Sequence, residues 1–168
     1  MQRDRQEWLQ YHRQLNENRK LWSIDPLEVI INRLQSMSPR LKIGDFGCGT
    51  AKIMEELGFE RVISFDHVAI NDKVIECDVR SVSKHLKDNS LDVIVFSLSL
   101  MGKNWREYIV EAKRCLSTRG SLFIAVTTKE LDEGRRLHLL PIILKNNGFS
   151  IDTKEERGDF TFMEGIKI

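Results

Sequence analysis

Three acidic residues follow three apolar segments of the chain, and a glycine-rich turn comes directly after the first. Asp45 lies in the string LKIGDFGCGTAK, Asp66 ends ERVISFD, and Asp78 ends KVIECD. Each apolar segment has the length and composition of a buried strand. Open α/β sheets bind their ligands at the carboxyl ends of parallel strands. The spacing therefore predicts a ligand site at which three carboxylates meet.

The glycine turn argues against two common nucleotide sites. Gly47 and Gly49 let the backbone turn sharply and approach a ligand with no side chain in the way. A nicotinamide-binding turn carries a further glycine where this chain has Lys52, and the Gly-Lys-Ser/Thr ending of a phosphate loop is missing. A carboxylate at position 45 would also repel a pyrophosphate. The turn favours a cationic ligand.

S-adenosylmethionine carries the groups that these carboxylates would bind. Asp45 would attract its ammonium and sulfonium, Asp66 would accept from its ribose hydroxyls, and Asp78 would accept from its adenine amino group. We therefore predict S-adenosylmethionine as the cofactor, held by these acids and by Gly47 and Gly49. An aspartate after a strand can instead cap a helix or turn, so this alternative stays open for each acid.

The segment VFSLSLMGKNW, residues 95–105, offers a strand end without an acid, a base or a nucleophile. Methyl transfer from a sulfonium depends mainly on alignment and exclusion of water. Ser99, Met101 and Asn104 are candidates for contacts with the methyl acceptor, although Asn104 could instead cap the following helix. No catalytic residue can be assigned, and no metal site is expected.

The cysteines and the overall charge narrow the class of protein. Cys48, Cys77 and Cys115 form no CxxC pair, so we expect neither a disulfide framework nor a zinc ribbon, and a reducing cytosol fits best. Cys48 is interpreted as a small residue of the glycine turn rather than as a nucleophile. The formal net charge of +1 argues against a strong phosphate-binding face. The charged N-terminus has no secretory signal, and no membrane association is expected.

The elements that would position these residues alternate between strands and helices. Strands are predicted over residues 41–46, 60–66, 73–78, 90–98, 120–128, 149–156 and 159–168. Helices are predicted over residues 3–20, 23–37, 47–58 (the glycine turn and the helix after it), 104–117 and 131–148, with a short helix at 81–86. Pro141 should kink the last helix or begin a new turn. Asp25 is the predicted N-cap of the second helix, with Pro26 in its first turn.

This alternation predicts an α/β fold of the Rossmann-like, class I methyltransferase type. The sheet should have seven strands, mostly parallel, with one antiparallel strand near the C-terminal edge and helices on both faces. We expect one methyltransferase domain, 1–168, in which residues 1–38 form a helical lid or cap segment and residues 39–168 form the Rossmann-like core.

Several strings resemble the methyltransferase domain of the ribosomal RNA-processing protein eight (nucleomethylin-like) family. They are DFGCG, SFDHVA, ECDV and above all VFSLSLMGKNWREYIVEAKRCL. The N-terminal YHRQLNENRKLWSIDPLEVII and the C-terminal NNGF and FTFMEGIKI extend the likeness to nearly the whole chain. SLSLMG is rare outside this family.

The resemblance implies a function and a set of contacts. It implies methylation of N1 of an adenine in ribosomal RNA, whose in-plane lone pair needs no base, and cofactor contacts by His12, Gly47, Asp66, Asp78, Val79 and Ser97. Ser97 stands where the family usually has cysteine, which keeps a small polar group there. Two alternatives remain: a cofactor-binding scaffold without catalysis, and a methyltransferase that acts on a protein or a small molecule.

RNA is the partner that the resemblance implies, but the basic residues are scattered along the chain and balanced by acids. Arg3, Arg5, Arg13, Arg135 and Arg136 form no continuous run, and no aromatic-basic RNA-binding strand motif is present. We therefore expect a protein partner or a fused domain to supply RNA affinity. The expected location is the cytoplasm, or the nucleolus if the cell is eukaryotic.

Overall fold

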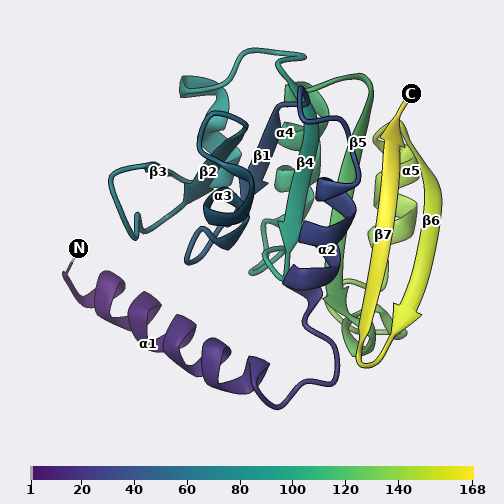
Figure 1. Cartoon of the computed structure of the whole chain (residues 1–168). Helices are drawn as coiled ribbons and strands as arrows, with labels where there is room; N and C mark the ends of the chain where they lie inside the picture. Colours follow the sequence, from purple (N-terminus) through teal and green to yellow (C-terminus); the bar gives the residue numbers. More distant parts are fainter. Residues whose placement is uncertain (1) are drawn as a thin grey trace.

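A seven-stranded mixed sheet lies between two layers of helices in the computed structural model, which describes residues 2–168 (Figure 1). The strand order is β3-β2-β1-β4-β5-β7-β6. The parallel strands are β1 (Ile43–Phe46), β2 (Val62–Asp66), β3 (Val74–Glu76), β4 (Leu91–Ser97) and β5 (Leu116–Thr127). β7 (Phe160–Lys167) runs antiparallel between β5 and β6 (Phe149–Arg157). The predicted Rossmann-like fold is thus confirmed.

Strand β4 shows why the central strands read as continuous apolar runs. Ile94 and Phe96 pack into the core on one face of the sheet, and Val93 and Val95 pack into the core on the other. Both faces of a parallel sheet are covered by helices, so alternating positions are all buried. The same holds for β1, in which every residue is buried.

The helices divide between the two faces. α2 (Pro26–Gln35) and α3 (Lys52–Leu57) cover one face, whereas the 3-10 helix η1 (Val79–Lys84), α4 (Trp105–Cys115) and α5 (Leu140–Asn146) cover the other (Figure 1). Asp25 caps α2 as predicted, because its carboxylate accepts from the Leu27 backbone N–H at 3.0 Å, and Pro26 occupies the first turn.

The last third of the chain differs in its boundaries from the sequence prediction. α5 begins at Leu140 rather than at residue 131, so Pro141 lies in the first turn of a new helix, where its missing N–H has no cost. A second 3-10 helix, η2 (Thr128–Leu131), and turns occupy the residues before it. β5 begins four residues earlier than predicted, because Leu116 already pairs with Leu91.

The expected lid segment, 1–38, divides into two parts with different roles. Ile30, Ile31 and Leu34 of α2 belong to the core on one face of the sheet. Only α1 (Gln2–Arg19) stands apart from the sheet, where Figure 1 shows it as the purple helix. None of the helices in residues 2–168 is long and apolar enough to cross a membrane.

Candidate functional site

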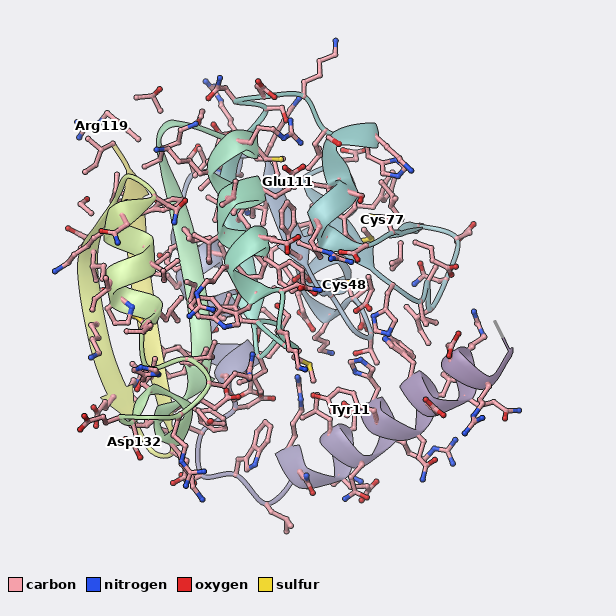
Figure 2. All side chains as sticks on the ribbon, turned by 180° about the vertical axis from the view of Figure 1, so that it is seen from behind. Tyr11, Cys48, Cys77, Glu111, Arg119 and Asp132 are labelled. Atoms are coloured by element: carbon pink, nitrogen blue, oxygen red, sulfur yellow. The ribbon has the colours of Figure 1, made fainter. Side chains whose placement is uncertain are left out.

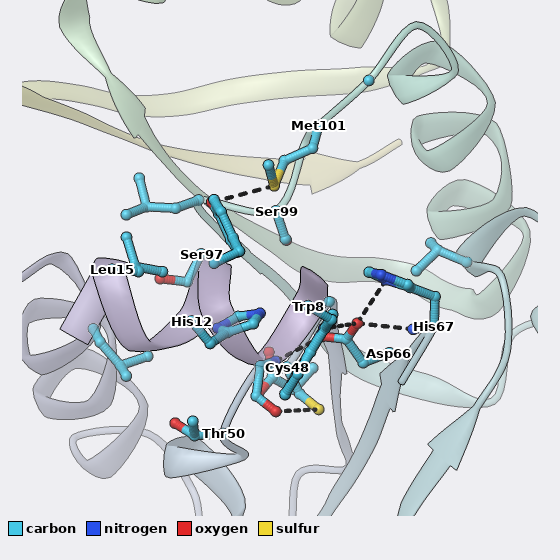
Figure 3. Close-up of a pocket in the computed structure, with 18 of the residues that line it drawn as sticks. Trp8, His12, Leu15, Cys48, Thr50, Asp66, His67, Ser97, Ser99 and Met101 are labelled. Carbon is cyan, nitrogen blue, oxygen red and sulfur yellow. Dashed lines mark hydrogen bonds and ion pairs between the residues drawn. The ribbon is translucent and has the colours of Figure 1, made fainter. Parts of the chain in front are cut away.

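A cavity of about 610 Å³ lies between α1 and the carboxyl ends of β1, β2 and β4 (Figure 3). Its volume falls within the range of about 300–1,000 Å³ that is common for small-molecule sites. All of the predicted cofactor contacts line it: His12, Asp45, Gly47, Gly49, Asp66, Asp78, Val79 and Ser97. The fold thus gathers these residues around one space, although their contacts with a cofactor stay predictions.

The glycine turn is shaped by backbone conformation and by crowding. Gly47 and Gly49 both have positive φ, of 79° and 55°, which side chains other than glycine rarely adopt. A Cβ on Gly47 would lie 2.5 Å from the Cβ of Ser99, and one on Gly49 would lie 2.8 Å from the His12 ring. The backbone N–H of Gly47 donates to the Phe65 carbonyl at 2.8 Å, which ties the turn to β2.

Asp45 is an almost fully buried carboxylate that faces the cavity. Its residue is 2% exposed, and no hydrogen bond reaches its side chain from within residues 2–168. Burial, with a smaller effect of the Asp66 charge, raises the pKa of Asp45 to about 7. A buried acid of this kind is stabilised in its charged form by a cation within a few ångströms. The cavity therefore has a place for a positively charged group.

Asp66 already uses its carboxylate within the protein. One oxygen accepts from Gly49 N–H at 2.8 Å, and the other accepts from His67 N–H at 2.8 Å and from Trp8 Nε1 at 3.1 Å. The His67 ring lies at 2.9 Å from the same oxygen. Burial alone would raise the pKa of Asp66, but these hydrogen bonds hold it below its ordinary value. The Trp8 indole lies where ribose hydroxyls were predicted to donate.

Asp78 and Val79 form the entry to η1. Asp78 is the N-cap, accepting from Arg80 N–H at 2.9 Å, and its second oxygen receives the Arg80 guanidinium at 2.6 Å. Asp78 therefore caps a helix, which is the alternative role that the sequence left open for it. Val79 is buried and lines the cavity beside Asp78. An adenine amino group would have to share the Asp78 carboxylate with Arg80.

One face of α1 closes the cavity with three ring side chains. The Trp8 ring packs against the His12 ring, with centroids 4.1 Å apart. Burial lowers the pKa of His12, so the ring lies neutral over the glycine turn. Tyr11 points from α1 toward the sheet, where its hydroxyl donates to the Met101 sulfur at 3.5 Å (Figure 2). Trp8 and Tyr11 were not among the predicted cofactor or acceptor contacts, yet both line the cavity.

The end of β4 contributes an unpaired hydroxyl and a strained turn. Ser97 Oγ is buried and has no hydrogen-bond partner among the described residues. Leu98 has φ of +54°, which is uncommon for a side chain of this size and often marks a functional site. Ser99 donates to the Phe46 carbonyl at 2.6 Å, so its hydroxyl is occupied by the backbone. Met101 lines the cavity, whereas Asn104 does not. Asn104 occupies the N-cap position of α4, but its side chain makes no capping hydrogen bond there.

The cavity cysteines are poor nucleophiles. Burial raises the pKa of the Cys48 thiol, with smaller effects from the charges of Asp45 and Asp66, so that it stays protonated near neutral pH. Burial also raises the pKa of Cys77, to about 11. Within residues 2–168, no group of three or more potential metal ligands comes together. The interpretation of Cys48 as a small turn residue fits this environment.

Comparison with known proteins gives one family and several relatives. A family model described as "Hypothetical methyltransferase" matches residues 1–168. Ribosomal RNA-processing protein 8 of Dictyostelium discoideum is 37% identical over 98% of this chain and 42% of the relative. A Schizosaccharomyces pombe protein named 25S rRNA (adenine(645)-N(1))-methyltransferase is 35% identical over 68% of this chain and 39% of its own length. The chain thus spans less than half the length of these relatives.

Solved structures share the fold at low sequence identity. A SAM-dependent methyltransferase from Aquifex aeolicus superposes with a TM-score of 0.72 at 16% identity, covering 95% of this chain and 98% of that one. The 1,6-didemethyltoxoflavin-N1-methyltransferase of Burkholderia thailandensis gives 0.66 at 14% identity, covering 95% and 86%. These similarities establish the class I methyltransferase fold.

Proposed function

Because the chain belongs to this family of hypothetical methyltransferases and resembles ribosomal RNA-processing protein 8, we propose that it transfers a methyl group from S-adenosylmethionine to N1 of an adenine in ribosomal RNA. The main observation behind the proposal is the 610 Å³ cavity at the strand ends, because every predicted cofactor residue lines it. The name of the Schizosaccharomyces pombe relative supports the acceptor atom.

The residues around the cavity fit the cofactor. Asp45 is a buried carboxylate without a partner in the described chain, and it would pair with the ammonium. The buried Ser97 hydroxyl, which also has no partner there, can donate to or accept from a polar group of the ligand. Gly47 and Gly49 hold backbone against the same space. When bound, the cofactor supplies a methyl group already activated by the positive charge on sulfur.

Ribose binding by Asp66 requires a change of hydrogen-bond partners. The backbone N–H groups of Gly49 and His67 would stay on the carboxylate, because both belong to the backbone that directly follows β1 and β2. The Trp8 indole and the His67 ring would give way to the two hydroxyls. Such an exchange costs little, since one hydrogen bond to a charged group replaces another. A small displacement of α1 would therefore accompany cofactor entry.

The chemistry of the strand end agrees with attack by a ring nitrogen. N1 of adenine has an in-plane lone pair, so no proton must leave before the methyl group moves. Ser97, Ser99 and Met101 offer neither a carboxylate nor a basic nitrogen. The site can therefore work by holding the acceptor in line with the sulfonium and by excluding water beneath α1.

Affinity for RNA must come from more than this chain's net charge. The formal charge is only +1, which gives a weak general attraction to phosphates. We propose that a protein partner positions the RNA, or that a further segment does so, because this chain spans less than half the length of the relatives. A role in ribosome production would place the protein in the nucleolus of a eukaryotic cell.

Two measurements test the proposal. Calorimetry with S-adenosylmethionine should give a single site in the wild type and in the exposed control variant Asp152→Asn, and much weaker binding in Asp45→Asn. A folded wild-type sample that releases no heat would refute the proposal. Methyl transfer to ribosomal RNA from a strain lacking the gene, followed by mapping of the modified atom, tests the acceptor. If the protein binds the cofactor but does not methylate that RNA, the remaining functions are a non-catalytic scaffold or a methyltransferase with another acceptor.

A further inference from the structure

A second, smaller cavity adjoins the first at the end of β4 and has a different chemical character. Its volume is about 370 Å³. Five residues line both cavities, so the two spaces meet there: Tyr11, Leu15, Leu98, Met101 and Gly102. The remaining lining comes from Trp22, Leu100, Val126, Thr127, Glu130 and Arg136. We call this smaller cavity the acceptor slot.

The slot has aromatic and apolar walls. Trp22 lies on one side, fixed by an edge-to-face contact with Phe160 whose ring centroids are 4.9 Å apart. Tyr11 of α1 contributes a second ring. Leu100, from the loop after β4, and Val126 of β5 form apolar surface, and each is 1% exposed. Aromatic rings beside buried aliphatic groups favour a flat heteroaromatic ring over a flexible chain, because a planar ring stacks against them.

One polar pair, Glu130 and Arg136, interrupts these walls. Arg136 donates to the Leu100 carbonyl, to the Gly102 carbonyl at 3.3 Å, and to one Glu130 oxygen at 2.6 Å. The guanidinium thereby ties η2 to the strand-end loop and fixes the orientation of the carboxylate. The second Glu130 oxygen accepts no hydrogen bond from residues 2–168, so it remains an acceptor at the edge of the slot.

The charge of Glu130 acts on a residue at the junction of the two cavities, where Leu98 also lies. Burial and then the charge of Glu130 raise the pKa of Tyr11, which lines both cavities. Leu98, in its left-handed conformation, turns the chain directly after β4 and lines both cavities too. Strained backbone of this kind is common at functional sites.

We propose that the acceptor slot holds the purine that is methylated, and that Glu130 recognises an amino group adjacent to the attacking ring nitrogen. The inference rests on the proposed function and adds the residues that choose the base. Adenine presents an amino donor beside N1. Guanine and uracil present carbonyl oxygens at the corresponding place, which a carboxylate repels. Cytosine has the amino group but a smaller ring, so it fills less of the slot.

The transfer balances without any further reactant. The N1 lone pair forms the new bond to the methyl carbon while the bond from that carbon to sulfur breaks, and its electron pair stays on sulfur. The positive charge passes from sulfur to the purine ring. A positively charged ring makes its amino group a stronger donor, so the hydrogen bond to Glu130 strengthens along the reaction. Glu130 therefore acts as a specificity-determining residue that also favours the transition state.

The test uses methyl transfer to synthetic uridine-rich RNA that carries one adenine. Glu130→Gln should lower kcat/KM for this RNA about 10- to 100-fold, as expected for loss of a hydrogen bond to a charged group. The affinity for S-adenosylmethionine should stay unchanged, because Glu130 does not line the cofactor cavity. Glu133→Gln, an exposed residue of the following turn, is the matched control and should behave as the wild type. Glu130→Asp should recover part of the loss.

A change in the RNA base, rather than in the protein, tests the same contact. Purine in place of adenine removes the amino group and also its electron donation to N1, so both proteins should be slower on purine. The loss in kcat/KM should be about 10- to 100-fold greater in the wild type than in Glu130→Gln. An equal loss in the two proteins would overturn the inference while leaving the proposed function intact.

A binding measurement gives an answer even when turnover is slow. With the protein saturated by S-adenosylhomocysteine, the RNA carrying adenine should bind more tightly than the RNA carrying purine, and Glu130→Gln should remove the difference. Equal binding of the two RNAs by the wild type would overturn the role of Glu130. A failure of the cofactor itself to bind would instead refute the proposed function.

Discussion

Replacement of Asp45 by Asn tests whether the buried carboxylate receives the cofactor's ammonium. The wild-type pKa of about 7 means that the carboxylate is only partly charged in the free protein at neutral pH. A bound ammonium stabilises the charged form, so binding should release a proton below pH 7. The affinity for S-adenosylmethionine should therefore rise with pH and level off above about 7.

The size of this effect follows from the pKa. With a pKa of about 7, Asp45 is about 3% ionised at pH 5.5 and about 75% ionised at pH 7.5. The association constant should increase about 25-fold between these pH values, which corresponds to about 2 kcal/mol. Asp45→Asn should bind more weakly at pH 7.5 and should lack this part of the pH dependence.

Calorimetry in buffers of different ionisation enthalpy measures both the affinity and the proton release. His12, His67 and Asp66 also line the cavity, and the hydrogen bond to Asp66 raises the pKa of His67. These residues are present in the variant as well, so the difference between the two proteins isolates Asp45. The same dependence of affinity on pH in wild type and variant would refute the assignment of Asp45 to the ammonium.

The pKa of Asp45 also makes a prediction about stability without any ligand. Asp45 has an ordinary pKa of 3.8 in the unfolded chain and a pKa of about 7 in the folded protein. Between these two pH values the folded protein keeps a proton that the unfolded chain has lost. The contribution of this group to stability is therefore greatest at low pH and falls as the pH rises to about 7, by at most about 4 kcal/mol. Denaturant unfolding of Asp45→Asn should show a flatter profile over that range and a more stable protein at pH 8.

Three further changes test other parts of the structure. Trp8→Phe keeps a ring on α1 but removes the donor that competes for Asp66. The cofactor affinity measured by calorimetry should therefore rise about 10- to 100-fold, the value of one hydrogen bond to a charged group, whereas weaker binding would mean that the indole assists the ligand. Gly47→Ala places a side chain on a left-handed backbone position, in contact with Ser99. Urea titration should show a free energy of unfolding lower by about 1–3 kcal/mol, and cofactor binding should be lost. A variant as stable as the wild type would contradict the predicted steric clash. Asp25→Ala removes the N-cap of α2 and should lower the free energy of unfolding by about 1 kcal/mol. The cofactor affinity should stay unchanged, and a change in affinity would show that α2 influences the cavity.

The sequence identified most of the core because its patterns are local. A run such as that of β4 is buried on both faces, and the glycine turn follows β1 directly, so neighbouring residues carry the signal. The carboxyl ends of parallel strands then meet by the topology of the fold. Asp45, Asp66 and Ser97 could be placed at one site for this reason.

The alternation in the last strand was a weaker guide. Phe160 and Phe162 alternate with other residues in β7, a pattern that favours one buried face, yet Thr161 and Met163 are more deeply buried than Phe162. β7 lies between β5 and β6 rather than at the edge, and both of its faces are covered in part. Strand order depends on long-range pairing, which a local pattern does not contain.

What the sequence alone determined, then, is the fold class, the glycine turn and the row of acids, since each depends on residues close together in the chain. Only the tertiary structure decided how those acids are used: Trp8 reaches Asp66 across 58 positions, Arg80 takes up Asp78, and Asp45 is left without a partner in the described chain. The acceptor slot likewise exists only because α1, the loop after β4, the end of β5 and η2 come together in space. Hydrogen bonds and burial act over a few ångströms of space, whereas sequence patterns act over a few residues of chain.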